Sequence, residues 1–175
     1  MAVDESLTFT PINIALLTVS DTRGPDDDTS GDILAERIEQ ARHRLVNRAI
    51  VRDDARLLAK QLREWIADPD VDAIVSTGGT GLTGRDVTPE ALDMVKTKDI
   101  PGFGELFRWV SLETIGTSTI QSRACAVLAD STYIFALPGS NGAVKDGWDK
   151  ILREQLDSRH RPCNFVELMP RLREK

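Results

Sequence analysis

The alternation of apolar runs with amphipathic segments is the feature that most constrains the fold of this chain. Residues 12–19 (INIALLTV) are almost continuously apolar, as expected of a strand that is covered on both faces. Residues 45–51 and 71–76 predict two further strands, and residues 55–67 between them place apolar side chains at helical spacing. Such alternation favours a layered α/β domain with a largely parallel sheet.

The rest of the chain continues this pattern. Thr29 or Ser30 can cap a helix that runs to about residue 42, and Thr88 followed by Pro89 marks the start of another. A three-residue turn, 129–131, separates two apolar runs and predicts paired strands. The further elements expected are helices at 105–112 and from about 140 to 156, and strands at 124–128 and 132–137.

Length and charge narrow the possible classes of protein. The chain has 175 residues, which suits one domain, and its formal net charge of −6 provides no basic face for nucleic acid. No apolar run reaches the roughly 18 residues of a membrane span. The first residues are acidic where a secretory signal is basic, so we expect a cytoplasmic protein. We divide it into an N-terminal extension (1–11), a ligand-binding α/β domain (12–160) and a C-terminal tail (161–175).

The cysteines and histidines predict neither a metal site nor a catalytic triad. Cys125 and Cys163 lack the short spacing of zinc ligands. His43 and His160 each lie between two arginines, and we expect both to be exposed.

Three polar loops follow predicted strands, at the edge where open α/β sheets bind their ligands. They cover residues 20–31, 77–86 and 138–142. The second loop begins with the sequence TGGTG, whose bare backbone amides suit phosphate oxygens; a tight turn without a ligand is the alternative. The loop has neither the Gly-Lys-Ser/Thr of a P-loop nor the glycine spacing of dinucleotide-binding domains. A P-loop NTPase and a Rossmann dehydrogenase are therefore disfavoured.

Carboxylates accompany these loops. Asp86 follows the glycine-rich loop, and Asp53 follows the second predicted strand. Magnesium bound to a nucleotide takes only one or two protein carboxylates, so both are candidate ligands for Mg²⁺ held through the substrate. A helix N-cap is an equally simple role for Asp53 or for Asp54. For residues 26–28 we expect a solvated loop.

Four ordered groups of motifs resemble the MoaB/MogA family of molybdenum-cofactor biosynthesis proteins. The motifs are TVSD (18–21) with DTSG (28–31), TGGTG (77–81) with RDVTPEA (85–91), PGFGE (101–105), and LPGS (137–140). The resemblance covers about residues 12–164. Three features place the chain nearer to MoaB: the stretch Leu82-Thr83-Gly84, Asn141, and the ending RPCNF (161–165). It implies a three-layer α/β/α sandwich with a mostly parallel, mixed sheet, assembled into trimers or hexamers.

The resemblance also implies an activity. In this family Mg-ATP gives its AMP to the terminal phosphate of molybdopterin, and pyrophosphate leaves. Asp53 and Asp86 fall on the acidic positions tied to catalysis, ATP and molybdopterin would be the partners, and other molybdenum-cofactor enzymes are possible further partners. Such transfer depends on positioning and charge neutralisation rather than on a protein nucleophile. The residues expected to bind phosphate, pterin or nucleotide are Ser20, Asp21, Ser30, Gly31, Thr77, Gly78, Gly79, Thr80, Gly81, Glu105, Pro138, Gly139 and Ser140.

Two other functions stay open at this point. One is a non-catalytic molybdopterin-binding or assembly subunit of the same pathway, and the other is a CinA-like nucleotide pyrophosphatase. The expected homo-oligomer rests partly on the tail, where Phe165, Val166, Leu168 and Met169 are too few to form a core. Docking onto a neighbouring copy would bury them; packing back onto the same domain is the alternative.

Overall fold

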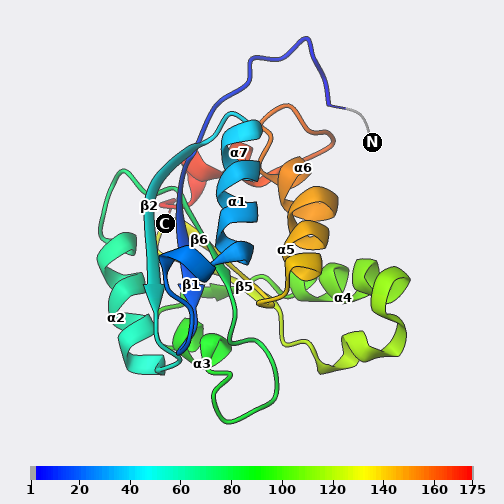
Figure 1. The fold of residues 1–175 in the computed structure, drawn as a ribbon. Helices are drawn as coiled ribbons and strands as arrows, with labels where there is room; N and C mark the ends of the chain where they lie inside the picture. Colours follow the sequence, from blue (N-terminus) through cyan, green and yellow to red (C-terminus); the bar gives the residue numbers. More distant parts are fainter. Residues whose placement is uncertain (1–2, 175) are drawn as a thin grey trace.

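The computed structural model describes residues 3–174, which form a six-stranded mixed sheet between two layers of helices (Figure 1). The strands are β1 (Asn13–Val19), β2 (Arg44–Val51), β3 (Ala73–Thr77), β4 (Lys98–Asp99), β5 (Cys125–Ala129) and β6 (Thr132–Leu137). Strands β2, β1, β3 and β6 are parallel neighbours, β5 pairs antiparallel with β6, and β4 pairs antiparallel with β5.

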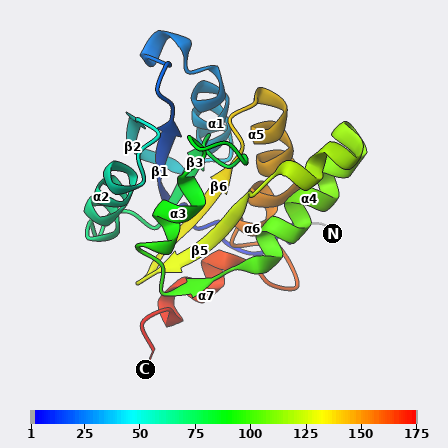
Figure 2. The same ribbon diagram turned by 90° about the horizontal axis from the view of Figure 1, so that it is seen from below.

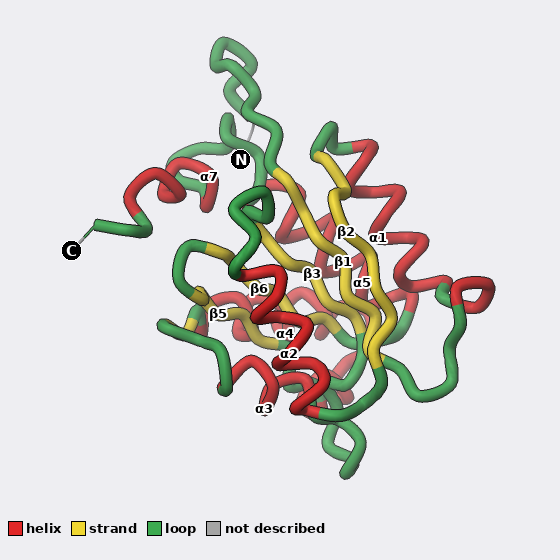
Figure 3. The backbone as a smooth tube through the Cα atoms, turned by 90° about the vertical axis from the view of Figure 1, so that its left-hand side faces the viewer, coloured by secondary structure: helices red, strands yellow, loops and turns green. Residues whose placement is uncertain are grey.

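Each face of the sheet is covered because the central strands are apolar on both sides. In β1, Ile14 and Leu16 face one core, whereas Ala15 and Leu17 face the other. The first core lies under α1 (Thr29–Gln40), α4 (Pro101–Ile115), α5 (Asn141–Gly147), α6 (Arg153–Gln155) and α7 (Phe165–Leu168), and the second under α2 (Ala55–Ile66) and α3 (Thr88–Asp93). Figures 2 and 3 show the strands between these two sets of helices, which confirms the three-layer α/β/α fold.

Two elements differ from expectation for local reasons. Strand β4 was not predicted because it has two residues, both charged. Helix α4 begins at Pro101, four residues before the predicted start. Its first turn includes Gly104, where a Cβ would lie 2.5 Å from the carbonyl oxygen of Ala124, so the glycine permits close contact between α4 and the sheet. A π-helical segment, Trp148–Leu152, joins α5 to α6.

The start of α1 corrects the prediction that Asp28 lies in a solvated loop. Asp28 is fully buried, and its carboxylate accepts hydrogen bonds from Thr18 Oγ1 (2.7 Å), the Gly31 amide (3.0 Å) and Arg48 Nη2 (2.7 Å). It is therefore Asp28, rather than Thr29 or Ser30, that caps α1.

The N-termini of α2 and α3 show which residues cap these two helices. Asp54 caps α2 by accepting hydrogen bonds from the amides of Arg56 and Leu57, so Asp53 is not its cap. Thr88 is the first residue of α3 rather than its cap. Its hydroxyl instead donates to the carbonyl oxygen of Gly78 at 2.8 Å, which ties α3 to the glycine-rich loop.

The C-terminal tail packs back onto its own domain. The ring of Phe165 lies 4.8 Å from that of Tyr133 and 5.4 Å from that of Phe135, centroid to centroid, and Val166 is buried. Phe165 and Val166 thus pack onto their own domain, whereas Leu168 stays 45% exposed, and docking of the tail onto a neighbouring copy stays a prediction. Among the residues that the structure describes, no helix combines the length and apolarity needed to cross a membrane.

Both histidines are buried, contrary to expectation. The imidazole of His43 lies against the ring of Phe9, and its Nδ1 accepts a hydrogen bond from the amide of Ile12 at 3.3 Å. Burial lowers the pKa of His43 to about 4; Asp157 opposes this shift and Arg42 adds to it. His43 thus serves as a neutral acceptor where the N-terminal segment enters β1.

We expect Gly31→Ala to lower the free energy of unfolding by about 1–3 kcal/mol, the usual cost of overpacking. A Cβ at position 31 would lie 2.0 Å from Asp28 Oδ2, a fully buried atom, whereas alanine at an open helical position is neutral or stabilising. Urea denaturation measures the change, and Gly102→Ala, with nothing within 4 Å of its Cβ, is the matched control. Equal stabilities of the two variants would contradict this role.

We also expect the stability to fall as the pH is lowered from about 6.5 to 4. In this window the unfolded chain binds a proton at His43 that the folded chain excludes, since the folded pKa is about 4 against an ordinary 6.5. Replacing His43 with Asn should flatten the stability curve by at most about 1.4 kcal/mol per pH unit. Denaturant titrations at several pH values test this, and parallel curves for both proteins would refute it.

Candidate functional site

The candidate site lies where the connections from neighbouring parallel strands diverge. The chain leaves β1 toward β2 on one side and leaves β3 toward the opposite half of the sheet, so a crevice forms at their carboxyl ends. The loops after β1, β2, β3 and β6 meet at this end of the sheet (Figure 1, lower side). The fold therefore brings together loops that are far apart in the sequence.

The glycine-rich loop after β3 needs its first two glycines. Gly78 and Gly79 have φ angles of +104° and +66°, which other L-residues rarely adopt. A Cβ on Gly78 would lie 2.3 Å from the carbonyl oxygen of Val19, and one on Gly79 would lie 2.4 Å from Thr88 Oγ1. The loop is thus a tight turn, and its backbone at Gly78 and Gly79 lies beside the end of β1 without side chains in between.

Arg123, which precedes β5, fixes the second half of this loop. Its amide donates to the carbonyl oxygen of Thr80 (2.8 Å), and its Nε donates to that of Gly81 (2.6 Å). Its guanidinium also donates to the carbonyl oxygen of Asp86 and pairs with Glu90 on α3. Sequence reasoning missed Arg123 because nothing around it marks a functional position.

A polar cavity of about 340 Å³ lies between these loops. Asp53 and Asp86, the two predicted catalytic residues, both line it, together with Arg23 and Arg85, which were not predicted. The other predicted residues that line it are Ser20, Asp21, Gly78, Gly79, Thr80, Gly81, Pro138 and Gly139. Arg23 could have been predicted as a site residue from its position in the loop that follows β1.

The two aspartates have opposite electrostatic environments. Burial and the nearby negative charges of Asp21 and Asp86 raise the pKa of Asp53. Partial burial acts to raise the pKa of Asp86 too, but hydrogen bonds from Thr83 and Gly81 outweigh it, so that pKa is lowered. Asp86 accepts from both the amide (2.8 Å) and the hydroxyl (2.7 Å) of Thr83. A cation beside Asp53 would offset its repulsion from Asp21 and Asp86.

The donor set fits a cation shared with a ligand. Within residues 3–174, no group of three or more His, Cys, Asp or Glu side chains is arranged to hold a metal ion. Asp53 and Asp86 line the same cavity as the glycine-rich loop, and Mg²⁺ in such settings takes one or two carboxylates and completes its shell with phosphates and water.

Five predicted binding residues lie outside the polar cavity. Ser30, Gly31 and Thr77 are buried beneath it, and the Thr77 hydroxyl bonds to Ser30 Oγ (3.3 Å) and to the carbonyl oxygen of Pro138 (3.2 Å). Ser140 caps α5 and lines a neighbouring cavity. Glu105 lies in a separate cavity beside β4 and β5.

An apolar cavity of about 440 Å³ adjoins the polar one. The two cavities share Thr80, Gly81 and Pro138, and the apolar one extends between α4 and α5 to Phe107 and Ile115. The Thr80 hydroxyl is buried at this boundary, and it has no hydrogen-bond partner among the residues that the structure describes. It is therefore a free donor and acceptor for a ligand that spans both cavities.

Comparisons with known proteins show the family to which the chain is related. Residues 15–158 match the family model described as a probable molybdopterin binding domain. Molybdenum cofactor biosynthesis protein B of Escherichia coli K12 is 49% identical over 160 residues, which cover 91% of this chain and 94% of that protein. A crystal structure of a molybdenum cofactor biosynthesis protein B, 35% identical, has a TM-score of 0.85 and matches 95% of this chain and 98% of its own.

The crystal structure of the tungsten cofactor synthesizing protein MoaB from Pyrococcus furiosus is 32% identical, with a TM-score of 0.77, and the match covers 94% of this chain and 98% of that one. The family model spans most of the chain, and these relatives share nearly its whole length. The chain therefore belongs to the MoaB/MogA family of molybdenum-cofactor biosynthesis proteins.

Proposed function

We propose that this protein binds molybdopterin and Mg-ATP in the cytoplasm and adenylylates the terminal phosphate of the pterin. The observation that supports the proposal best is the polar cavity, where Asp53, Asp86 and the glycine-rich loop meet beside an apolar cavity. Phosphate groups suit the first cavity, and a flat heteroaromatic ring suits the second. Both substrates of the proposed reaction combine these two kinds of group.

The reaction needs little covalent chemistry from the protein. An oxygen of the pterin phosphate forms a bond to the α-phosphorus of ATP, and the bond from that phosphorus to the bridging oxygen breaks. Pyrophosphate leaves with the electron pair. A phosphate monoester is already largely ionised at neutral pH, because its second pKa is about 6. The attacking group thus needs no general base, and the protein contributes position and charge.

Each part of the site has a role in this reaction. Asp86, whose carboxylate is oriented by Thr83, and Asp53 would bind Mg²⁺ together with the phosphates. Magnesium bound there would neutralise phosphate charge. The glycine-rich loop lets phosphate oxygens approach the backbone, and Arg123 keeps that loop in place. The buried Thr80 hydroxyl can hydrogen-bond to the ligand at the junction of the two cavities.

We expect Asp86→Asn to lower turnover by about a hundredfold or more, the order found for losing one preorganised charge-stabilising group. The amide keeps the size of the side chain but removes its charge. The assay mixes protein, molybdopterin, ATP and magnesium and measures adenylylated pterin and pyrophosphate, with thermal unfolding as a check on the fold. Asp70→Asn, at an exposed turn remote from the cavity, is the matched control.

The same assay separates the alternatives. Full activity of Asp86→Asn at saturating magnesium would remove Asp86 from the mechanism. Pterin binding by the wild type without any product would favour a non-catalytic binding subunit, and cleavage of ATP in the absence of pterin would favour a nucleotide pyrophosphatase. Asp53→Asn should also reduce turnover, since Asp53 lines the cavity and does not cap α2.

We further propose that the protein forms a homo-oligomer through α4. Leu106, Trp109, Leu112 and Ile115 recur every third residue of this helix and are all exposed, Trp109 by 68%. Ile120, in the segment that follows α4, is 81% exposed. In a symmetric homo-oligomer, these exposed residues of α4 would be buried on every subunit by contact with other copies of the same chain.

Trp109→Lys is expected to dissociate the assembly, because a charge at the centre of an apolar interface is costly to bury. Light scattering at micromolar concentration measures the mass of each protein. Leu57→Lys, on the exposed side of α2, is the control and should stay associated. A monomeric wild type would refute the oligomer, and a Trp109→Lys variant of unchanged mass would refute the interface.

A further inference from the structure

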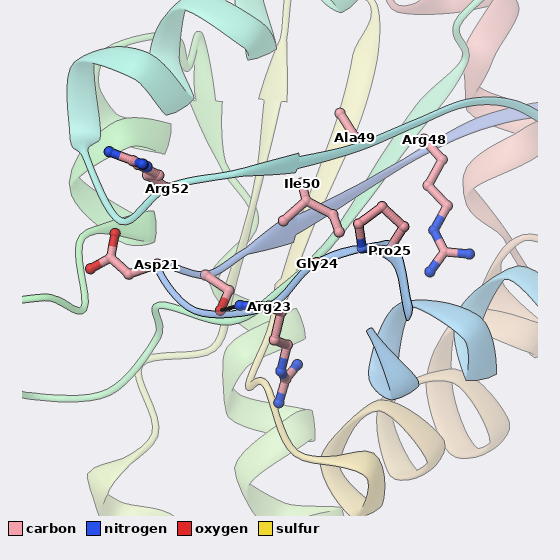
Figure 4. A pocket seen from close by; sticks show the side chains of 9 residues that line it. Asp21, Arg23, Gly24, Pro25, Arg48, Ala49, Ile50 and Arg52 are labelled. Carbon is pink, nitrogen blue, oxygen red and sulfur yellow. Dashed lines mark hydrogen bonds between the residues drawn. The ribbon is translucent and has the colours of Figure 1, made fainter. Parts of the chain in front are cut away.

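A further cavity of about 640 Å³, lined by both apolar and charged residues, lies between the loop after β1 and the end of β2 (Figure 4). Arg23 and Pro25 line it from the loop, and Arg48, Ile50 and Arg52 line it from the strand. It shares Ser20, Asp21 and Arg23 with the cavity that contains Asp53 and Asp86. The two cavities are therefore continuous on the side away from the apolar cavity, and we call the new one the basic cavity.

Three arginines and one carboxylate, Asp21, line the basic cavity, and two of the arginines form no salt bridge among the described residues. The guanidinium of Arg48 pairs with Asp28 and Asp32, each at 2.7 Å, so its charge is neutralised from α1. Arg23 donates only to uncharged acceptors, Ser30 Oγ at 2.7 Å and the carbonyl oxygen of Gly139 at 3.0 Å. Within residues 3–174, neither Arg23 nor Arg52 has a carboxylate oxygen within 4.0 Å of its guanidinium.

Arg23 and Arg52, the two arginines without a salt bridge among the described residues, lie at different places around the cavity. In Figure 4 the Arg23 side chain leaves the loop below the cavity, and Arg52 lies at the end of β2 on the same side as Asp21. Arg23 lines both the first cavity and the basic cavity, and its guanidinium reaches the carbonyl oxygen of Gly139. A chain of phosphates that extends from the first cavity toward the end of β2 would lie between Arg23, on the side of Gly139, and Arg52.

The proposed adenylyl transfer needs a place for a polyanion at this position. When the bond from the α-phosphorus to the bridging oxygen breaks, that oxygen and its electron pair stay with pyrophosphate, which gains negative charge. Guanidinium groups stabilise such charge through several N–H donors at once. The apolar cavity, on the other side, offers mostly carbon atoms and is a poor site for this leaving group.

We propose that the basic cavity binds the pyrophosphate end of the nucleotide, with Arg23 and Arg52 as its cationic contacts. This inference rests on the proposed adenylyl transfer and assigns the leaving group to its own subsite. It also gives Arg23 a function beyond its two neutral hydrogen bonds. The ligand class is inorganic pyrophosphate or the terminal phosphates of a nucleoside triphosphate.

The test measures binding of inorganic pyrophosphate and of AMP to the full-length protein by calorimetry in the presence of magnesium. We expect Arg52→Gln and Arg23→Gln each to weaken pyrophosphate binding about tenfold. Arg52→Gln should leave AMP binding unchanged, because AMP lacks the two terminal phosphates and Arg52 does not line the first cavity. Arg52 is exposed and has no salt bridge among the described residues, so its replacement should not disturb the fold. Arg23→Lys, which keeps the charge, should retain most of the affinity.

Arg153→Gln is the matched control, since it removes the same charge from an exposed position on α6. The proposal is overturned if the wild type does not bind pyrophosphate, if both variants bind it like the wild type, or if the control loses as much affinity. These outcomes are separate from those of the adenylylation assay, because pyrophosphate binding needs neither pterin nor turnover. A wild type that transfers AMP while both variants bind pyrophosphate normally would refute this subsite alone.

Discussion

The site depends first on one buried carboxylate, that of Asp28. Without compensation a buried charge is costly, so its three donors must be in place together: Thr18 from β1, Arg48 from β2 and the amide of Gly31 in α1. These contacts join two strands to the helix that packs over them. They also set the start of α1, and with it the position of Ser30, which accepts a hydrogen bond from Arg23. The arrangement of the loop after β1 therefore follows from a residue that no ligand needs to touch.

The glycine-rich loop is fixed from several directions in the same way. The carbonyl oxygen of Leu137 accepts from the amide of Gly78, Thr88 donates to the carbonyl oxygen of Gly78, and Arg123 bonds to the carbonyl oxygens of Thr80 and Gly81. Three separate segments thus fix the backbone of this loop before any ligand binds. Such preorganisation is what a site needs when its contribution is position and charge rather than a nucleophile.

The sequence predicted the layers, the main strands and the loops of the site because these depend on local patterns. Continuous apolar runs mark buried strands, and TGGTG marks a turn that only glycine permits. It could not predict Asp28, since a row of three aspartates looks solvated until Arg48 and Thr18 are known to lie beside the third. Arg123 was missed for the same reason: its acceptors are carbonyl oxygens about forty residues earlier in the chain. Long-range partners of single polar residues leave no local pattern.

The pairing of β3 with β6 has a consequence for how the protein acquires its site. Ala73 pairs with Tyr133 and Thr77 with Leu137, so two strands that flank the crevice are neighbours in space but far apart in the sequence. Closing so long a loop is slow compared with forming local helices. We therefore expect the crevice to be among the last parts of the molecule to form. During synthesis, the edge of β3 that pairs with β6 stays unpaired until β6 has left the ribosome. In that interval the exposed strand edge can lead to aggregation of the nascent chain.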